Sequence, residues 1–76
     1  MFEITVSVFA GLRYELGFST ITISLQCGST ISNVLDLLEI HSSRPLIIVV
    51  NGQIVSKHMR LESGDSLSVF PLIGGG

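Results

Sequence analysis

The chain has 76 residues, a formal net charge of −2 and a hydrophobic share of 46 %. This length allows one domain, and a single cysteine excludes an internal disulfide, so the packing of side chains must stabilise the fold. The four basic residues are scattered along the chain, which excludes the basic stripe that nucleic-acid binding requires. The longest apolar run is too short to cross a bilayer and no signal peptide precedes it, so we expect a cytoplasmic protein without membrane association.

The first half of the chain predicts a β-hairpin followed by a helix. Residues 2–9 alternate apolar and polar side chains, and residues 21–26 do so again, which is typical of strands with one buried face. Between them, the glycine-bracketed segment 11–17 predicts a short helical turn or a structured loop. Thr30 or Ser29 can cap the following helix. That helix should run to about residue 40 or 41, because it carries the apolar stripe Ile31, Val34, Leu35 and Leu38.

The second half of the chain predicts three further strands. The continuous apolar run 46–50 indicates a buried central strand, and Asn51-Gly52 is a strong signal for a hairpin turn into an edge strand at 53–56. We expect a loop over 57–65 that ends in a turn at residues 63–65. Residues 66–70 form the last predicted strand, with Leu67 and Val69 facing inward and Phe70 facing outward.

The predicted order of elements is β-β-α-β-β-β. One main helix can cover one face of a small mixed sheet of four to five strands, which gives a two-layer α+β fold. We therefore expect residues 1–73 to form the domain and residues 74–76 to form a flexible C-terminal glycine tail.

Conventional catalytic and metal-binding patterns are not visible in the sequence. His41 and His58 have no partners at ligand spacing, and we interpret them as solvated surface side chains. Cys27 is interpreted as a small semi-buried filler, with a reactive thiol before the helix as the alternative. No glycine loop with phosphate-binding spacing follows a strand. We therefore expect no bound cofactor and no metal, which moves any chemistry to the tail or to a partner.

The C-terminal glycines have properties that suit a reacting group. Glycine lacks a Cβ atom, so an extended Gly75-Gly76 can thread a channel too narrow for other residues. The carboxylate of Gly76 is unhindered and ionised at neutral pH, so it can attack the α-phosphate of ATP in a partner enzyme. A frayed terminus is the alternative interpretation. On the functional interpretation, Gly76 reacts and Gly75 is required beside it, while Gly74 provides slack at the end of the segment that binds the partner.

The residues before the glycines predict a docking stem. Pro71 is expected to end ladder pairing and to stiffen the exit from the last strand. Leu72 and Ile73 are apolar although no core is left for them to join, so they either fold back over the sheet or dock a partner. We favour docking, because the outward-facing Phe9 can lie beside Phe70 and extend the apolar surface. The low charged share of 13 % also predicts exposed apolar surface, which usually marks a partner site.

The whole chain resembles the sulfur carriers of the MoaD/ThiS type, which have the β-grasp, ubiquitin-like fold. The resemblance rests on five segments in order, namely VFAGLRYELG, STISNVLDLL, VVNGQIV, ESGDSLSVFP and the terminal diglycine. It implies that an activating enzyme adenylates Gly76 with ATP, and that the product is converted to a thiocarboxylate that donates sulfur. It also implies that the partners contact Phe9, Leu12, Phe70 and Pro71, and that the chain is a carrier and not itself an enzyme.

The branch of this resemblance decides the expected sulfur acceptor. The segment GLRYELG is similar to the molybdopterin branch, which implies the small subunit of molybdopterin synthase and a large synthase subunit as its partner. The triple glycine is also seen in the thiamine branch, which implies a partner of the thiazole-synthase type. The remaining alternatives are a carrier for another sulfur-containing product, a ubiquitin-like protein modifier and an interaction module with an inert tail.

Overall fold

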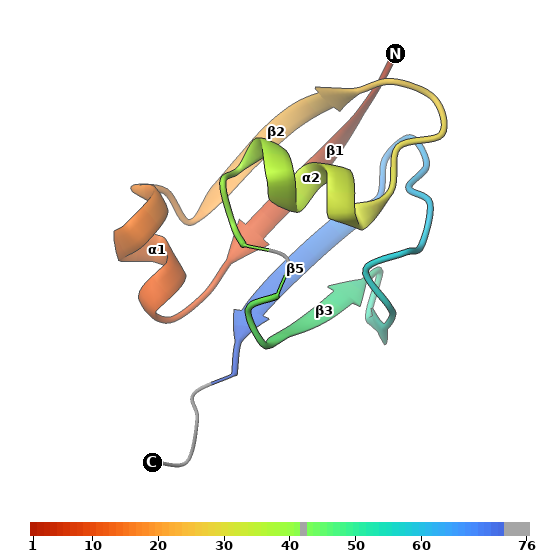
Figure 1. Ribbon diagram of the computed structural model, residues 1–76. Helices are drawn as coiled ribbons and strands as arrows, with labels where there is room; N and C mark the ends of the chain where they lie inside the picture. The colour runs from red at the N-terminus through yellow and green to blue at the C-terminus, as the bar shows by residue number, and fades with distance from the viewer. Residues whose placement is uncertain (42, 73–76) are drawn as a thin grey trace.

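One mixed sheet carries a helix on one face in the computed structural model, which describes residues 1–41 and 43–72 (Figure 1). The sheet has five strands in the order β2-β1-β5-β3-β4. The prediction of an α+β fold with one main helix over a mixed sheet is confirmed. The elements in chain order are β1 (Phe2–Val8), α1 (Gly11–Leu16), β2 (Thr20–Leu25), α2 (Ile31–Leu37), β3 (Leu46–Val50), β4 (Gln53–Ile54) and β5 (Ser66–Pro71).

The last strand lies in the middle of the sheet. β1 and β2 form the predicted antiparallel hairpin, in which Val6 pairs with Ile21. β1 also pairs in parallel with β5, and β5 pairs antiparallel with β3 on its other side. The predicted place of the strand at 46–50 inside the sheet is confirmed, since β3 lies between β5 and the two-residue edge strand β4, but its predicted burial holds for one face only. Ile48 and Val50 are buried while Ile47 is 36 % exposed, because no described helix covers the second face.

The core lies between α2 and the covered face of the sheet (Figure 1). The predicted helical stripe is confirmed, since Ile31, Val34 and Leu35 are fully buried and Leu38 packs against them. The inward-facing strand residues that meet this stripe are Ile4, Val6, Val8, Leu25, Ile48, Val50, Leu67 and Val69. Among the described residues no polar or charged side chain is buried, so stability rests on apolar packing, as composition predicts.

A capping box starts α2. The Thr30 hydroxyl oxygen accepts from the Asn33 N–H at 3.4 Å, and the Asn33 amide oxygen accepts from the Thr30 N–H at 2.8 Å. The Thr30 N–H thus gains a partner at the start of the helix, and the Asn33 N–H, which also donates to the Thr30 carbonyl oxygen at 3.1 Å, gains a second one. Of the two predicted capping residues, the structure selects Thr30.

α2 ends earlier than predicted, at Leu37 instead of residue 40 or 41. Glu39 adopts a left-handed φ of 59°, and its N–H donates to the Asp36 carbonyl oxygen at 3.1 Å. The Ile40 N–H donates to the Leu35 carbonyl oxygen at 2.8 Å, which completes a Schellman motif and returns Ile40 to the core. The sequence gives no signal for this stop, because such a position usually holds glycine.

Replacing Glu39 with glycine is expected to stabilise the fold. A left-handed φ strains a residue that has a Cβ atom, and glycine relieves this strain at some cost in chain entropy. We expect Glu39→Gly to raise the free energy of unfolding by ~0.5–1 kcal/mol, or roughly 2–8 °C in Tm. Thermal unfolding beside Glu39→Ala, which also removes the charge but keeps Cβ, isolates the backbone effect. Equal Tm values for the two variants would contradict it.

Two turns join β3, β4 and β5. Asn51 and Gly52 have φ values of 50° and 85°, as the predicted type of hairpin turn requires, although β4 is shorter than the predicted 53–56. The Asn51 side chain donates to Asp65 Oδ1 at 3.0 Å and accepts from the Ser66 N–H at 3.0 Å. The turn after β3 and the predicted turn before β5 are therefore tied together, and the loop between them buries Leu61.

Candidate functional site

Two aromatic rings stack where β1 and β5 end. The ring centroids of Phe9 and Phe70 lie 4.3 Å apart, with 8° between the ring planes. The parallel pairing of β1 with β5 brings them together, and the Phe9 N–H donates to the Val69 carbonyl oxygen at 3.2 Å. The prediction that Phe9 lies beside an outward-facing Phe70 is confirmed. Stacked aromatic pairs contribute ~0.5–1.5 kcal/mol beyond their buried area, so the stack is a firm part of this surface.

The helix α1 adds a cation to the stack. The Arg13 guanidinium carbon lies 5.4 Å from the centroid of the Phe9 ring, and Arg13 Nε donates to the Val8 carbonyl oxygen at 3.2 Å. Ala10 has a φ of 54° and turns the chain from β1 into α1, so that Arg13 comes over the ring. This cation–π contact holds Phe9 against Phe70. The sequence analysis did not predict the role of Arg13. The one pattern that could have indicated it is a basic residue four positions after an aromatic residue, with a turn between them.

An apolar patch surrounds the stack on the face of the sheet that no described helix covers. Ile47 pairs with Phe70, and Val49 pairs with Ile54, so these side chains share one face. The exposed fractions are 36 % for Ile47, 78 % for Ile54 and 49 % for Leu72. We name this surface the open-face patch, and its members are Phe9, Ile47, Val49, Ile54, Phe70 and Leu72. The prediction of exposed apolar surface is confirmed, and such surface is typical of partner sites.

The stem pairs further along β3 than predicted. Pro71 is the register partner of Leu46, and the Leu72 N–H donates to the Pro45 carbonyl oxygen at 3.1 Å. The prediction that Pro71 ends ladder pairing is therefore wrong. Successive N–H groups of a strand point to opposite sides, so the nitrogen of Pro71 faces the side of β1, which has already ended. Proline thus costs no ladder bond at this position, and Leu72 is held at a fixed point of the sheet.

The reacting residues of the predicted tail lie outside the described part of the chain. These are Gly75 and Gly76, together with Ile73 and Gly74 of the predicted partner-binding segment. Their roles stay predictions, as does the boundary between a domain at 1–73 and a tail at 74–76. The described residue nearest to them is Leu72, which is half-exposed beside the Phe9–Phe70 stack.

Leu12 does not belong to the surface. Its side chain is 1 % exposed and lies in the hydrophobic core, where α1 closes the end of the sheet. The expectation that Leu12 contacts a partner is therefore wrong for this conformation. The reason is that the predicted turn at 11–17 is a helix of six residues, and Leu12 is its one fully buried side chain. Leu12 supports the surface from beneath instead, since α1 carries the Arg13 that contacts Phe9.

The remaining candidate groups for chemistry are dispersed over the surface. His41 and His58 are exposed, as predicted, and the ring Nδ1 of His41 lies 2.7 Å from the Ser43 hydroxyl. Cys27 is also exposed, so its interpretation as a semi-buried filler is wrong, because the turn before α2 points it outward. Over residues 1–41 and 43–72 no three His, Cys, Asp or Glu side chains come together to hold a metal ion.

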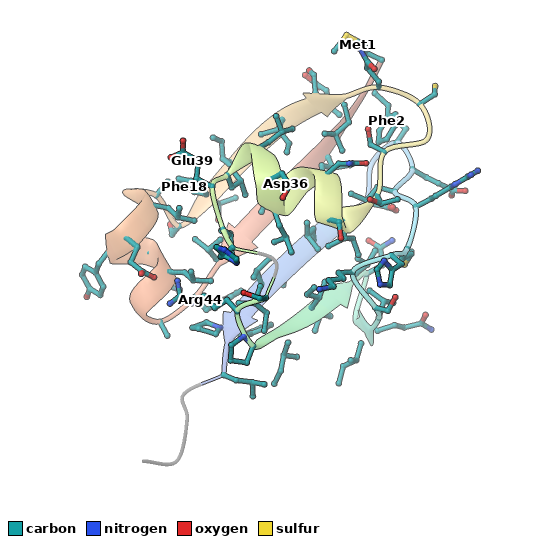
Figure 2. The ribbon with its side chains drawn as sticks, viewed as in Figure 1. Met1, Phe2, Phe18, Asp36, Glu39 and Arg44 are labelled. Carbon is teal, nitrogen blue, oxygen red and sulfur yellow. The ribbon has the colours of Figure 1, made fainter. Side chains whose placement is uncertain are left out.

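An ion pair connects the two segments that border the end of β5. Arg44 Nη2, in the loop before β3, lies 2.9 Å from Glu15 Oε2 of α1, and Figure 2 shows Arg44 reaching toward that helix. Both side chains are substantially exposed, so the pair contributes under about 1 kcal/mol. It orients α1 rather than stabilising the fold as a whole.

The order of the sheet, the single covering helix and the apolar surface at the end of β5 define a β-grasp, ubiquitin-like protein. The chain belongs to the ThiS family, whose model matches residues 6–76. This places it among the ubiquitin-fold sulfur carriers and modifiers related to MoaD and ThiS, which are small carrier proteins. No curated protein sequence matches the chain. Among its described helices, none is long and apolar enough to span a membrane.

Solved structures share the fold. A putative molybdopterin converting factor subunit 1 from Pyrococcus furiosus is 24 % identical, with a TM-score of 0.81 over 96 % of this chain and 100 % of that one. Small archaeal modifier protein 1 of Haloferax volcanii is 21 % identical, with a TM-score of 0.82 over 96 % and 100 %. A complex of subunits 1 and 2 of the Helicobacter pylori molybdopterin-converting factor contains a chain that is 18 % identical, with a TM-score of 0.63 over 97 % and 99 %. At these identities the likeness concerns the fold.

Proposed function

We propose that this chain is a sulfur carrier whose Gly76 carboxylate is the group that reacts. The observation that supports this most is the open-face patch, which ends at Leu72, four residues before Gly76. Four extended residues span at most about 14 Å, so a partner that covers the patch has the carboxylate within reach of its own active site. The folded part then presents the C-terminus to the partner, and the partner supplies the catalytic groups.

The proposed chemistry has two steps on the partner. A Gly76 carboxylate oxygen attacks the α-phosphorus of ATP and displaces pyrophosphate, which gives an acyl adenylate. Hydrosulfide from a sulfur donor then attacks the carbonyl carbon, so that a C–S bond replaces the C–O bond to AMP, AMP leaves, and loss of the thiol proton gives a thiocarboxylate. The chain itself supplies an unhindered carboxylate and a stem anchored by the Leu72 N–H, and it binds no cofactor of its own.

We further propose the molybdopterin branch as the pathway that receives the sulfur. The segment GLRYELG supports it, and in this chain it forms α1, which carries Arg13 over the Phe9 ring. The partners are then an adenylating enzyme and a large molybdopterin-synthase subunit in the cytoplasm. Protein modification is the second candidate, favoured by the likeness to a small archaeal modifier protein. A modifier would form amide bonds with lysines, seen as a ladder of conjugates on denaturing gels.

Intact-protein mass spectrometry tests the reaction. We expect the full chain, incubated with its adenylating enzyme, ATP and a sulfur donor, to gain the mass of an oxygen-to-sulfur exchange at Gly76. The matched control lacks Gly75 and Gly76 and should show no exchange while its Tm stays within about 2 °C of the full chain, because a glycine has no side chain that could pack into a core. Full exchange in the truncated chain, or none in the intact one, would refute the proposal. Transfer of the sulfur to a molybdopterin-type and not a thiazole-type acceptor tests the branch.

A further inference from the structure

One edge of the sheet presents a full row of backbone hydrogen-bonding groups. β2 is the terminal strand, and no described element lies outside it (Figure 1). The Val8 N–H donates to the Ser19 carbonyl oxygen at 2.9 Å, which sets the phase of the hairpin. Because peptide groups alternate in direction along a strand, the N–H and C=O groups of Thr20, Thr22 and Ser24 point away from β1. These six groups face outward along one straight edge.

This edge lacks the features that usually prevent strands from pairing with other chains. Residues 16–35 contain no charged side chain and no proline, and the register of β2 against β1 is unbroken from Ser7–Thr20 to Phe2–Leu25. Soluble proteins usually protect an exposed edge with lysine, proline, a bulge or a very short strand. The opposite edge follows that rule, since β4 has only two residues. The β2 edge is therefore open to pairing with a strand of another chain, whereas the β4 edge is protected by its short length.

We propose that the β2 edge binds the β2 edge of a second copy of this chain, antiparallel about a twofold axis at Thr22. The segment Thr20–Ser24 reads TITIS and is nearly palindromic about Thr22. In this register Thr22 pairs with its own copy and Thr20 pairs with Ser24, and each such pair exchanges two backbone hydrogen bonds, about six in all.

The side chains match in the same register. Ile21 of one copy comes opposite Ile23 of the other on the helix side, and the hydroxyl side chains meet one another on the open face. Cross-strand pairs of β-branched residues and of threonines are favourable, and no like charges come together. The β2 strand of a second copy is therefore complementary to this edge. A shift of the register by one residue would place isoleucine opposite threonine or serine on both faces of the sheet.

The surroundings of the edge leave room for a second strand. On the helix side, a shallow hollow of about 490 Å³ opens beside Ser24 and Leu25. Met1 and, from α2, Leu37 also line this hollow. Figure 2 shows Met1 and Phe18 near opposite ends of the edge strand. The open-face patch lies across β5 and β3, toward the other edge, so pairing through β2 leaves both patches accessible.

Engineered cysteines test the register directly. In a Cys27→Ser background, Thr22→Cys places two thiols on residues whose Cα atoms lie about 5.5 Å apart in the pair, within the range of ~4.4–6.8 Å for a disulfide. The matched control Thr20→Cys puts its two copies about 14 Å apart. With oxidised glutathione as oxidant, we expect covalent dimer from Thr22→Cys at least tenfold faster than from Thr20→Cys. Equal rates would overturn the proposed register.

Sedimentation equilibrium tests the association itself. Since the interface is small, we expect the mean mass to rise from 8.2 kDa toward twice that value only as the concentration approaches about 1 mM. Thr22→Pro should abolish the rise, because the lost N–H points away from β1 and its removal costs no internal bond. Thr22→Lys, which retains the N–H, should weaken it through like charges. A monomer at 1 mM, or a dimer that persists in Thr22→Pro with an unchanged Tm, would overturn the proposal.

Discussion

Leu12→Ala is expected to lower the free energy of unfolding by ~2–5 kcal/mol. Leu12 is fully buried, and α1 is too short to close over the cavity that alanine would leave. A domain of this size is stable by roughly 4–11 kcal/mol, so the variant would lose a large part of its stability. Urea unfolding followed by circular dichroism measures the loss.

A substitution in the same helix provides the control for Leu12. Tyr14 is 89 % exposed on α1, so Tyr14→Ala should change the free energy of unfolding by less than about 0.5 kcal/mol. A Leu12→Ala chain that unfolds like the wild type but binds its activating enzyme weakly would restore the surface role that the sequence suggested. The pair of variants thus separates support of the site from contact with the partner.

Leu72→Asp is expected to weaken binding to the activating enzyme roughly 30-fold or more without unfolding the chain. Leu72 is half-exposed beside the aromatic stack, where a partner that covers the open-face patch would desolvate it, and a buried carboxylate without a partner is costly. Its backbone bond to Pro45 does not depend on the side chain. Isothermal titration calorimetry measures the affinity.

Another exposed leucine makes the matched control for Leu72. Leu37 is 65 % exposed on α2, over the covered face of the sheet, so Leu37→Asp should leave the affinity within about twofold. Both measurements belong at low micromolar concentration, well below the range in which the β2 edges are expected to associate. If Leu37→Asp and Leu72→Asp weaken binding equally, the partner does not select the open-face patch.

Local patterns in the sequence predicted the elements but not all their neighbours. The alternation in β1, the stripe in α2 and the turn at Asn51-Gly52 each depend on residues close together in the chain, and the structure confirms all three. The middle position of β5 was not predicted, because the parallel pairing of β1 with β5 joins the two ends of the chain and leaves no local pattern. The early end of α2 was missed because Glu39 adopts a backbone conformation usually reserved for glycine.

Predictions about the candidate site likewise succeeded where they depended on local pattern and failed where they depended on tertiary structure. The neighbouring positions of Phe9 and Phe70 were predicted, since both residues were expected to face outward, but the parallel strand pairing that stacks their rings was not. The burial of Leu12 did not, because it depends on how α1 packs against β5, which tertiary structure alone decides. The pairing of Pro71 depends on which side of β5 its nitrogen faces, and this follows only from the ladder bond of Leu72. The tail residues 73–76 stay predictions from the sequence.

The central position of β5 also determines how the fold bears a mechanical load. A partner that draws the tail into its active site pulls β5 lengthwise, in the direction in which the strand already runs. β5 is bonded to β1 on one side and to β3 on the other, so this force acts on both ladders at once, in shear. Bonds loaded together resist far better than bonds that peel apart one after another, and forced unfolding is governed by that barrier. The folded domain can therefore be pulled through the C-terminal end of β5 without unfolding.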